Sequence, residues 1–228
     1  ELENLVRDSD FETLRKRIKH RNVQQYRDPY YQNFLGLLYC QGIGVEKVDF
    51  SKACEFFKKG REKDYPAATN NLGTMYVYGQ GVVQNFEEAE KLFLLASKQS
   101  YPPAYFNIGV LYENGCLHSD KTLNCSTAMK FYRIAAEGGY VPALYNIGVL
   151  FDKGFDDDGV FEKDVEVAVE HYLLAAQKGF SPAQVNLGIH YENGEGVKKN
   201  YVEALYWYYK ACSSGNADAY FFLAKLHF

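Results

Sequence analysis

The chain has 228 residues, of which 25 are basic and 29 acidic, so its formal net charge is −4 at neutral pH. This near balance gives no reason to expect a nucleic-acid binder, because such domains normally carry a basic face. No stretch approaches the roughly 18 apolar residues that a transmembrane helix needs, so direct membrane insertion is not expected within this sequence.

The first predicted element is a helix over residues 9–20, where Ser9 and Glu12 have the spacing of a capping box. Residues 1–30 are therefore expected to form an N-terminal capping region. A cluster of basic side chains within it is interpreted as the solvated side of this helix, with an anionic partner or a membrane surface as the alternative. Its members are Arg15, Lys16, Arg17, Lys19, His20 and Arg21.

From residue 31 onward one pattern recurs five times at a period of 36 to 40 residues. Each copy has a glycine, an aromatic residue three positions later and a second glycine six positions later. Further along, each copy has an alanine followed by aromatic residues at three or four positions. Self-similarity at this period indicates a stacked solenoid in which each unit buries its apolar face against its neighbours. The first glycines are Gly36, Gly73, Gly109, Gly148 and Gly188, and the alanines are Ala53, Ala89, Ala128, Ala168 and Ala204.

Each copy is expected to form two helices separated by a glycine turn. In the third copy, Ala104, Ile108 and Leu111 fall on one stripe of a helix, and a second helix is predicted from about residue 126 to 137. A glycine inside the first helix costs about 1 kcal/mol relative to alanine. We interpret this glycine as making room for aromatic side chains of the second helix. An Asn or Asp after the turn is expected to cap the second helix.

The recurring pattern resembles the Sel1-like repeat, a tetratricopeptide-related family. It reads Ala-x-x-x-(Leu/Ile)-Gly-x-x-Tyr-x-x-Gly-x-Gly-Val-x-x-(Asp/Asn)-x-x-x-Ala-x-x-aromatic-aromatic-x-x-Ala, and it covers residues 31–228. The third and fourth copies lack the Gly-x-Gly-Val turn and carry longer loops at 116–125 and 155–164. The resemblance implies an all-α fold, namely a right-handed α/α superhelix (solenoid) of about five helix-turn-helix repeats with terminal capping helices. It also implies an adaptor or scaffold function.

The expected domain organisation follows from the spacing of the copies. The five repeats are predicted at about 31–66, 67–102, 103–141, 142–181 and 182–216. Residues 217–228 are predicted to form one more helix, which is either a closing cap or the first helix of a truncated sixth repeat.

Four asparagines in register provide the leading candidate for a binding site, because each lies two residues before the repeat glycine. In related helical repeats this row faces the concave groove, where amide side chains can bond to a peptide backbone as donor and acceptor. The alternative is that each asparagine bonds within or between repeats and holds the stack together. The four are Asn71, Asn107, Asn146 and Asn186.

Aromatic and acidic neighbours extend this candidate site. Phe106 and Tyr145 directly precede the asparagine row, and Glu113, Asp152 and Glu192 follow it by two helical turns. Together they would favour an extended protein or peptide partner that carries Lys or Arg. The alternative for the acidic residues is an ordinary solvated surface.

No catalytic residue, metal site or cofactor is predicted. Phosphate-binding, zinc-protease and hydrolase motifs are absent from the sequence. The run from Asp156 to Gly159 fails the calcium-loop pattern, because Val165 stands where a bidentate Glu is needed. The set Cys116, His118 and Cys125 lacks a fourth zinc ligand. The helical residues His171 and His190 are interpreted as packed or surface side chains.

The sequence thus predicts a non-enzymatic scaffold or adaptor that binds a partner protein or extended peptide on its concave face. The alternative is the regulatory or adaptor arm of a larger enzyme or membrane-anchored complex, for example in protein quality control. The chain has five cysteines, an odd number, whereas a disulfide-built secreted protein usually has an even number. This count favours a cytoplasmic location. The endoplasmic reticulum lumen or secretion is the alternative, in which Cys116 and Cys125 could be bridged. The partner, the pathway and the oligomeric state stay open.

Overall fold

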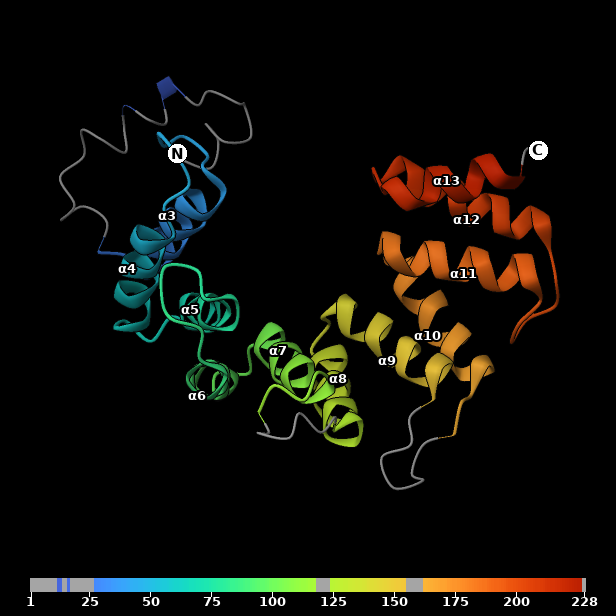
Figure 1. Cartoon of the computed structure of the whole chain (residues 1–228), viewed down its shortest axis with the longest axis horizontal. Coiled ribbons are helices and arrows are strands. Elements are labelled where there is room, and N and C mark those ends of the chain that lie inside the picture. Colours follow the sequence, from blue (N-terminus) through green and yellow to red (C-terminus); the bar gives the residue numbers. More distant parts are fainter. Residues whose placement is uncertain (1–11, 14–15, 17–26, 118–123, 155–161, 227–228) are drawn as a thin grey trace. The chain divides into compact units, whose positions relative to one another are not determined.

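The computed structural model describes residues 12–13, 16, 27–117, 124–154 and 162–226. Within these residues, eleven helices are defined, labelled α3 to α13, and no strand is present (Figure 1). The predicted all-α fold of helix-turn-helix repeats is therefore confirmed.

The helices follow one another as five pairs and one further helix. We call the first helix of a pair helix A and the second helix B, and we number the pairs as repeats 1 to 5. The pairs are α3 (Pro29–Gln41) with α4 (Phe50–Arg61), α5 (Pro66–Tyr78) with α6 (Phe86–Ser97), α7 (Pro102–Glu113) with α8 (Cys125–Glu137), α9 (Val141–Lys153) with α10 (Val165–Gln177), and α11 (Ser181–Asn193) with α12 (Tyr201–Ser213); α13 (Ala217–Leu226) follows.

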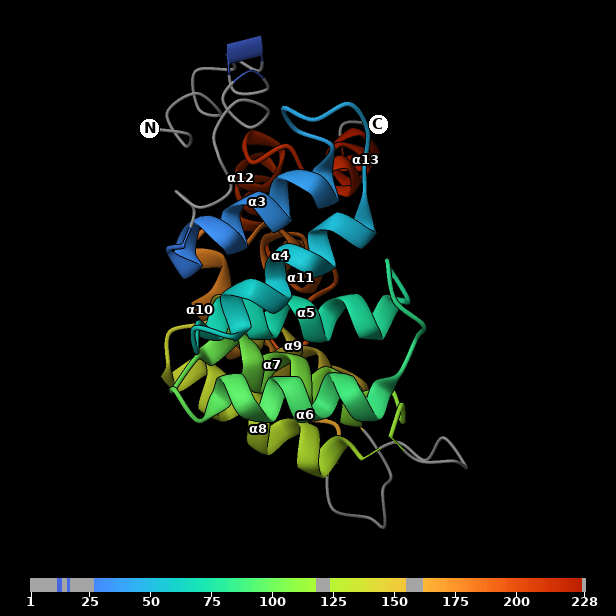
Figure 2. The same cartoon turned by 90° about the vertical axis from the view of Figure 1, so that its left-hand side faces the viewer.

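The chain divides into two compact units, residues 1–107 and 108–228, with the division inside α7. Unit 1 contains the helix pairs of repeats 1 and 2, and α5 and α6 lie side by side in it (Figure 2). Unit 2 contains the end of α7 and the helices from α8 to α13.

Short polar side chains start every helix B, as the sequence predicts. The Asn85 side chain accepts a hydrogen bond from the Glu88 amide at 2.9 Å, which satisfies one of the free N–H groups of the first turn. The other helices B begin with the same kind of cap, from Asp49, Asn124, Asp164 and Asn200.

The glycine inside each helix A is required by close contact with helix B. A Cβ atom at Gly73 would lie 2.6 Å from a ring carbon of Phe93, and one at Gly109 would lie 2.6 Å from a ring carbon of Tyr132. We call this ring of helix B, which packs on the glycine of helix A, the knob of the repeat. The predicted role of the glycine is confirmed in all five repeats. The knobs are Phe57, Phe93, Tyr132, Tyr172 and Tyr208.

A second glycine contact joins neighbouring repeats through their backbones. Gly81, in the turn of repeat 2, packs on the carbonyl of Phe50 at the start of α4. Gly196, in the turn of repeat 5, meets the carbonyl of Val165 at the start of α10, where an added Cβ would lie 2.6 Å from the oxygen. We call these two contacts the turn seams. Both glycines also have positive φ angles, 70° and 69°.

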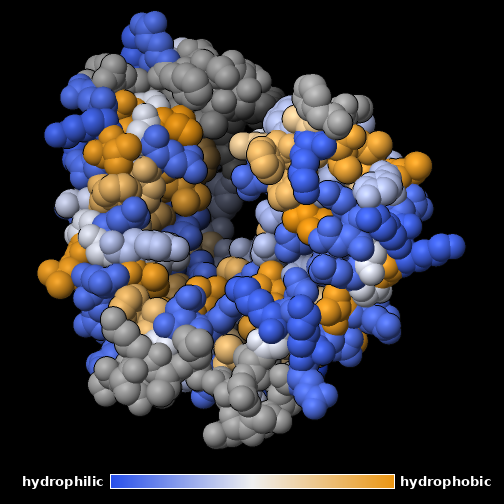
Figure 3. All heavy atoms as spheres, turned by 45° about the vertical axis from the view of Figure 1, so that its right-hand side comes forward, coloured by the Kyte–Doolittle hydropathy of each residue, from blue (hydrophilic) through white to orange (hydrophobic). Residues whose placement is uncertain are grey.

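Outside the core, exposed hydrophobic side chains are mixed with hydrophilic ones on the surface seen in Figure 3. None of the helices in the described part of the chain is long and apolar enough to cross a bilayer. Ser9 of the predicted capping box lies outside the described residues. Glu12 is described, and its side chain forms an exposed ion pair with Lys16 at 2.9 Å.

Candidate functional site

In unit 1 the asparagines of the predicted row connect neighbouring repeats. The amide nitrogen of Asn71 donates to the side-chain oxygen of Asn33 at 2.8 Å, and that of Asn107 donates to the side-chain oxygen of Asn70 at 2.8 Å. Asn33 and Asn70 stand three residues before the glycine of the preceding repeat, and neither of them is part of the predicted site. A primary amide has two N–H donors and one acceptor oxygen, so a single bond leaves further bonding capacity.

In unit 2 the corresponding asparagines bond to tyrosines. The Asn146 side chain hydrogen-bonds to the hydroxyl of Tyr132, the knob of repeat 3. The Asn186 side chain reaches the hydroxyls of Tyr172 and Tyr145 in repeat 4. All four asparagines of the row are half-buried and contact the preceding repeat.

The three acidic residues of the predicted site accept hydrogen bonds from the knob of their own repeat. The Tyr208 hydroxyl donates to Glu192 at 2.9 Å, and Tyr132 donates to Glu113. Tyr172 is hydrogen-bonded in the same way to Asp152. These carboxylates therefore join helix A to helix B in repeats 3, 4 and 5.

Burial and the adjoining carboxylates change the acidity of the knob tyrosines. Burial is the largest cause that raises the pKa of Tyr132, Tyr172 and Tyr208 far above the ordinary value for tyrosine. The neighbouring carboxylate adds to the increase, because a second negative charge beside it is unfavourable. The hydroxyls stay protonated and act as donors throughout the physiological range.

The carboxylates occur only where the knob is a tyrosine. Each stands four residues after the repeat glycine, in repeats 3 to 5. In repeats 1 and 2 the knobs are Phe57 and Phe93, and the same helix A position holds Cys40 and Val77. This pairing of residue types was readable in the sequence, and it indicates the contact that the structure contains.

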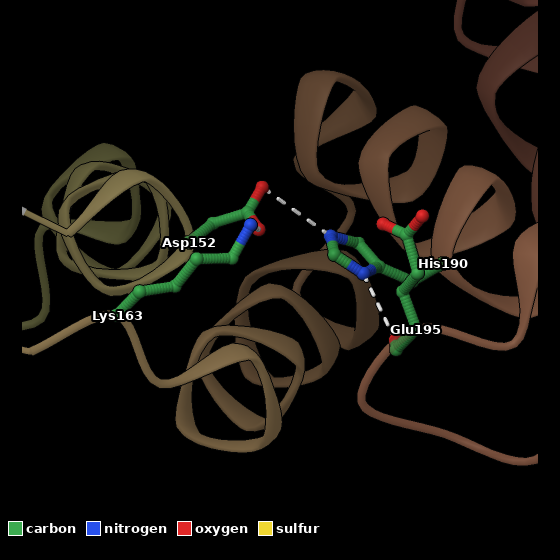
Figure 4. A network of polar contacts seen from close by, with 4 residues as sticks. All are labelled: Asp152, Lys163, His190 and Glu195. Carbon is green, nitrogen blue, oxygen red and sulfur yellow. Dashed lines mark hydrogen bonds and ion pairs between the residues drawn. The ribbon is translucent and has the colours of Figure 1, made fainter.

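His190 joins repeat 4 to repeat 5 at a position that holds Leu or Met in the other repeats. Its ring is buried, with Nδ1 3.0 Å from the Glu195 carbonyl and Nε2 3.5 Å from the Asp152 carboxylate (Figure 4). A carbonyl oxygen only accepts, so Nδ1 carries a proton. Lys163 approaches the other oxygen of Asp152 at 3.9 Å. Of the two interpretations offered for His190, a packed or a surface side chain, the structure shows the packed one.

The remaining predicted residues lie beside this row. Phe106 and Tyr145 are half-buried, and the Tyr145 ring lies 5.4 Å from that of Phe180. Lys225 of α13 donates to Glu192 at 3.0 Å, which continues the polar contacts from α11 to α13. His171 is half-buried and bonds through Nδ1 to the carbonyl of Val167 at 2.8 Å.

Among the described residues, no group of three or more His, Cys, Asp or Glu side chains is arranged to hold a metal ion. His118 and the Asp156–Gly159 run lie outside the described residues. Burial raises the pKa of Cys40 to about 11 and also raises that of Cys54. Both thiols are therefore protonated at neutral pH and are weak nucleophiles. The arrangement is suited to hydrogen bonding and packing.

Comparison with known proteins agrees with this architecture. The Sel1 repeat family model matches residues 29–65, 66–101, 102–140, 141–180 and 181–216. The crystal structure of a Sel1 repeat protein from Oxalobacter formigenes is 32% identical, with a TM-score of 0.78 over 96% of this chain and 85% of that one. The structure of c5321, a protective antigen of uropathogenic Escherichia coli with an SLR fold, is 26% identical, with a TM-score of 0.52 over 90% of this chain and 50% of that one.

A curated relative matches over a shorter segment. The ERAD-associated E3 ubiquitin-protein ligase component HRD3B of Arabidopsis thaliana is 39% identical over 57 residues, which is 25% of this chain and 9% of that protein. Sel1 repeat proteins generally mediate protein–protein interactions and are typically non-catalytic. The family model matches the five helix pairs in order, so this chain belongs to the Sel1 repeat family.

Proposed function

We propose that the chain is a non-enzymatic scaffold that binds an extended segment of a partner protein along the helix A face, which we expect to be concave. The observation that carries the proposal is the register of Asn71, Asn107, Asn146 and Asn186. Each is half-buried, and each is fixed from one side by the preceding repeat. An amide held in this way loses little side-chain entropy when it bonds to a peptide, because its rotamer is already selected.

Acidic and aromatic neighbours favour a partner segment that carries Lys or Arg. The carboxylates of Glu113, Asp152 and Glu192 each accept one tyrosine hydroxyl, and an ionised carboxylate has capacity for further donors. Lys225 already uses this capacity on Glu192 within the chain, at 3.0 Å. A basic side chain of a partner would bond in the same manner, with its stem on Phe106 or Tyr145.

The first experiment compares a ladder variant with a matched outer-face variant. The ladder variant carries Asn107→Ala, Asn146→Ala and Asn186→Ala, and the control carries Lys91→Ala, Lys130→Ala and Glu170→Ala at exposed positions of three helices B. Partner capture is quantified for both, with helical content and melting temperature checked by circular dichroism. We expect the ladder variant to bind at least about tenfold more weakly, which corresponds to roughly 1.4 kcal/mol. Loss of binding in the outer-face variant alone would place the partner on helix B.

The preference for a basic segment has a separate test. Glu113→Gln with Glu192→Gln keeps an acceptor for each tyrosine but removes two charges. We expect weaker binding and a smaller dependence of affinity on salt concentration, because screening acts on charge pairs. Unchanged affinity and unchanged salt dependence would show that the carboxylates hold the helices of the repeats together and do not contact the partner.

A second candidate function is an adaptor arm in a membrane-anchored ubiquitin-ligase complex. The 39% identity to the HRD3B component over 57 residues favours it. This function would place the chain in the endoplasmic reticulum lumen, whereas the scaffold proposal by itself is compatible with the cytoplasm. Fractionation of the native protein, with protease protection of sealed microsomes, distinguishes the two locations. A protein that stays in the cytosolic fraction contradicts the adaptor function.

A further inference from the structure

Three sulfur-bearing side chains meet where repeat 1 packs on repeat 2. Cys40 lies near the end of α3, Cys54 lies in α4, and Met75 lies in α5. The Sγ atom of Cys40 is 3.8 Å from the Sδ atom of Met75. Cys54 and Met75 are buried in one hydrophobic cluster, and Cys40 packs against it. We call these three residues the sulfur cluster.

The Cys54 thiol lies close to the other two members of the sulfur cluster. Its Sγ atom donates to the carbonyl of Gln80 at 3.4 Å, in the turn that follows α5. Burial is the main cause of the raised pKa of Cys40, and the Cys54 thiol adds to the increase. Such an addition requires the two thiols to be neighbours, because the interaction between charges weakens with distance.

The same two helix A positions are in contact between repeats 4 and 5. Cys40 stands four residues after its repeat glycine and Met75 two residues after its own, and the equivalent residues are Asp152 and His190. Asp152 lies 3.5 Å from Nε2 of His190 (Figure 4). The stacking of repeats therefore brings this pair of positions together wherever their side chains are long enough. Between repeats 1 and 2 both positions carry sulfur, and so does the position after the helix B alanine, which is Cys54.

The spacing and the chemistry of the sulfur cluster suit a soft metal cation. Metal–sulfur bonds are about 2.3 Å long, so two bonds that meet at about 120° place their sulfur atoms about 4 Å apart. Thiolate and thioether ligands select soft ions such as Cu(I), whereas structural zinc almost always takes four ligands. In the described part of the chain, no third His, Cys, Asp or Glu joins the two thiols as a ligand. Three sulfurs without a fourth donor therefore favour Cu(I).

The surrounding charge and the access from solvent fit the same cation. Each thiol releases its proton to solvent when it binds a metal, so two thiolates with Cu(I) carry one net negative charge. The ammonium group of Lys58, one turn after Cys54 on α4, offsets this charge, and it already opposes the increase that burial causes in the pKa of Cys54. Cys40 is half-buried, which leaves the sulfur cluster accessible through this residue.

We propose that Cys40, Cys54 and Met75 bind one Cu(I) ion, which links α3, α4 and α5 of unit 1. The bound ion stabilises the packing of repeat 1 on repeat 2, because its three ligands are assembled only in the folded state. The proposal is independent of the asparagine row and of the partner that the scaffold binds.

The test is a titration of the whole chain with Cu(I), without oxygen and with a reductant present, against a coloured Cu(I) chelator as competitor. The ligand variants are Cys40→Val, Cys54→Val and Met75→Leu, which introduce the residues found at the equivalent positions of repeats 2, 4 and 1. The matched control is Cys116→Ser with Cys212→Ser, which removes two thiols outside the sulfur cluster. Circular dichroism checks the fold of every variant.

We expect the wild type and the control to bind one Cu(I) ion per chain. Either valine variant should bind about a hundredfold more weakly, and Met75→Leu about tenfold more weakly. X-ray absorption at the copper edge should count three sulfur neighbours in the wild type and two in Met75→Leu, which keeps both thiols.

Three results overturn the proposal. The first is a wild-type chain that takes no copper from the chelator. The second is binding that both valine variants retain, which would assign the copper to other thiols. The third is tighter binding of Zn(II) than of Cu(I), or fewer than three sulfur neighbours around copper in the wild type.

Discussion

The two units solve the same packing problem with different side chains. In unit 1 the knobs are phenylalanines, and neighbouring repeats are joined by asparagine pairs such as Asn33 with Asn71. In unit 2 the knobs are tyrosines, each bonded to a carboxylate of its own repeat, and in repeats 3 and 4 also to an asparagine of the next. The difference shows that one backbone contact, ring on glycine, is compatible with an apolar or a polar interface. Three positions together determine whether the interface is apolar or polar: the knob, the helix A position four residues after the repeat glycine, and the position three residues before that glycine.

The largest expected effect concerns the feature that the two units share. Gly73→Leu in unit 1 and Gly148→Leu in unit 2 each force a side chain into the space of the knob. We expect both variants to lose about 3 kcal/mol or more of unfolding free energy, since a buried ring and a helix must move apart. Chemical denaturation followed by circular dichroism measures the loss. A variant that keeps wild-type stability would mean that the knob contact is not required in that unit.

The second effect is a transplant of the polar interface into unit 1. Phe93→Tyr alone places a hydroxyl beside Val77, where no acceptor carboxylate stands, and we expect a loss of about 1 to 3 kcal/mol. Adding Val77→Glu recreates the pair found in repeats 3 to 5 and should recover most of that loss. Val77→Glu alone is the matched control. A double variant whose loss equals the sum of the two single losses would show no coupling.

The smallest effect is the share of the alkaline pH dependence that the tyrosine knobs contribute. The pKa of Tyr132 is raised by burial and by Glu113, so its contribution to stability is complete below about pH 10, where the unfolded chain begins to ionise, and is lost as the pH rises further. Tyr132→Phe with Glu113→Val converts repeat 3 to the unit 1 type. Between pH 8 and about 10.5 we expect this variant to lose less stability than wild type, by under about 1 kcal/mol.

Thermal melts at the two pH values, followed by the fluorescence of Trp207 in unit 2, measure this difference. The thiols of Cys40 and Cys54 also have raised pKa values, but both proteins carry them, so their effect cancels. Identical alkaline losses in the two proteins would assign the loss to groups other than Tyr132.

Repeat glycines, knobs and caps were predictable because each depends on local sequence and a fixed period. The register placed the aromatic side chains of helix B against Gly109, and the structure shows that Tyr132 makes the contact. The helix A face was less accessible to this reasoning, because a half-buried Asn or Glu can point to solvent or bond to a neighbouring repeat. The bond from Asn71 to Asn33 crosses 38 residues and depends on how two repeats stack. His190 was predicted only to be a packed or a surface side chain, because its burial and its contact with Asp152 also depend on how repeats 4 and 5 stack.

The turn seams determine which connections between helices can accept inserted residues. At Gly81 and Gly196 a backbone carbonyl of the preceding repeat leaves no room for a Cβ atom, so residues inserted in these turns would separate two repeats. Repeats 3 and 4 lack the Gly-x-Gly turn. The distance from their repeat glycine to that of the next repeat is longer than elsewhere, at 39 and 40 residues. Natural insertions, affinity tags and reporter peptides should accordingly be accepted in the connections of repeats 3 and 4 and rejected in those of repeats 2 and 5.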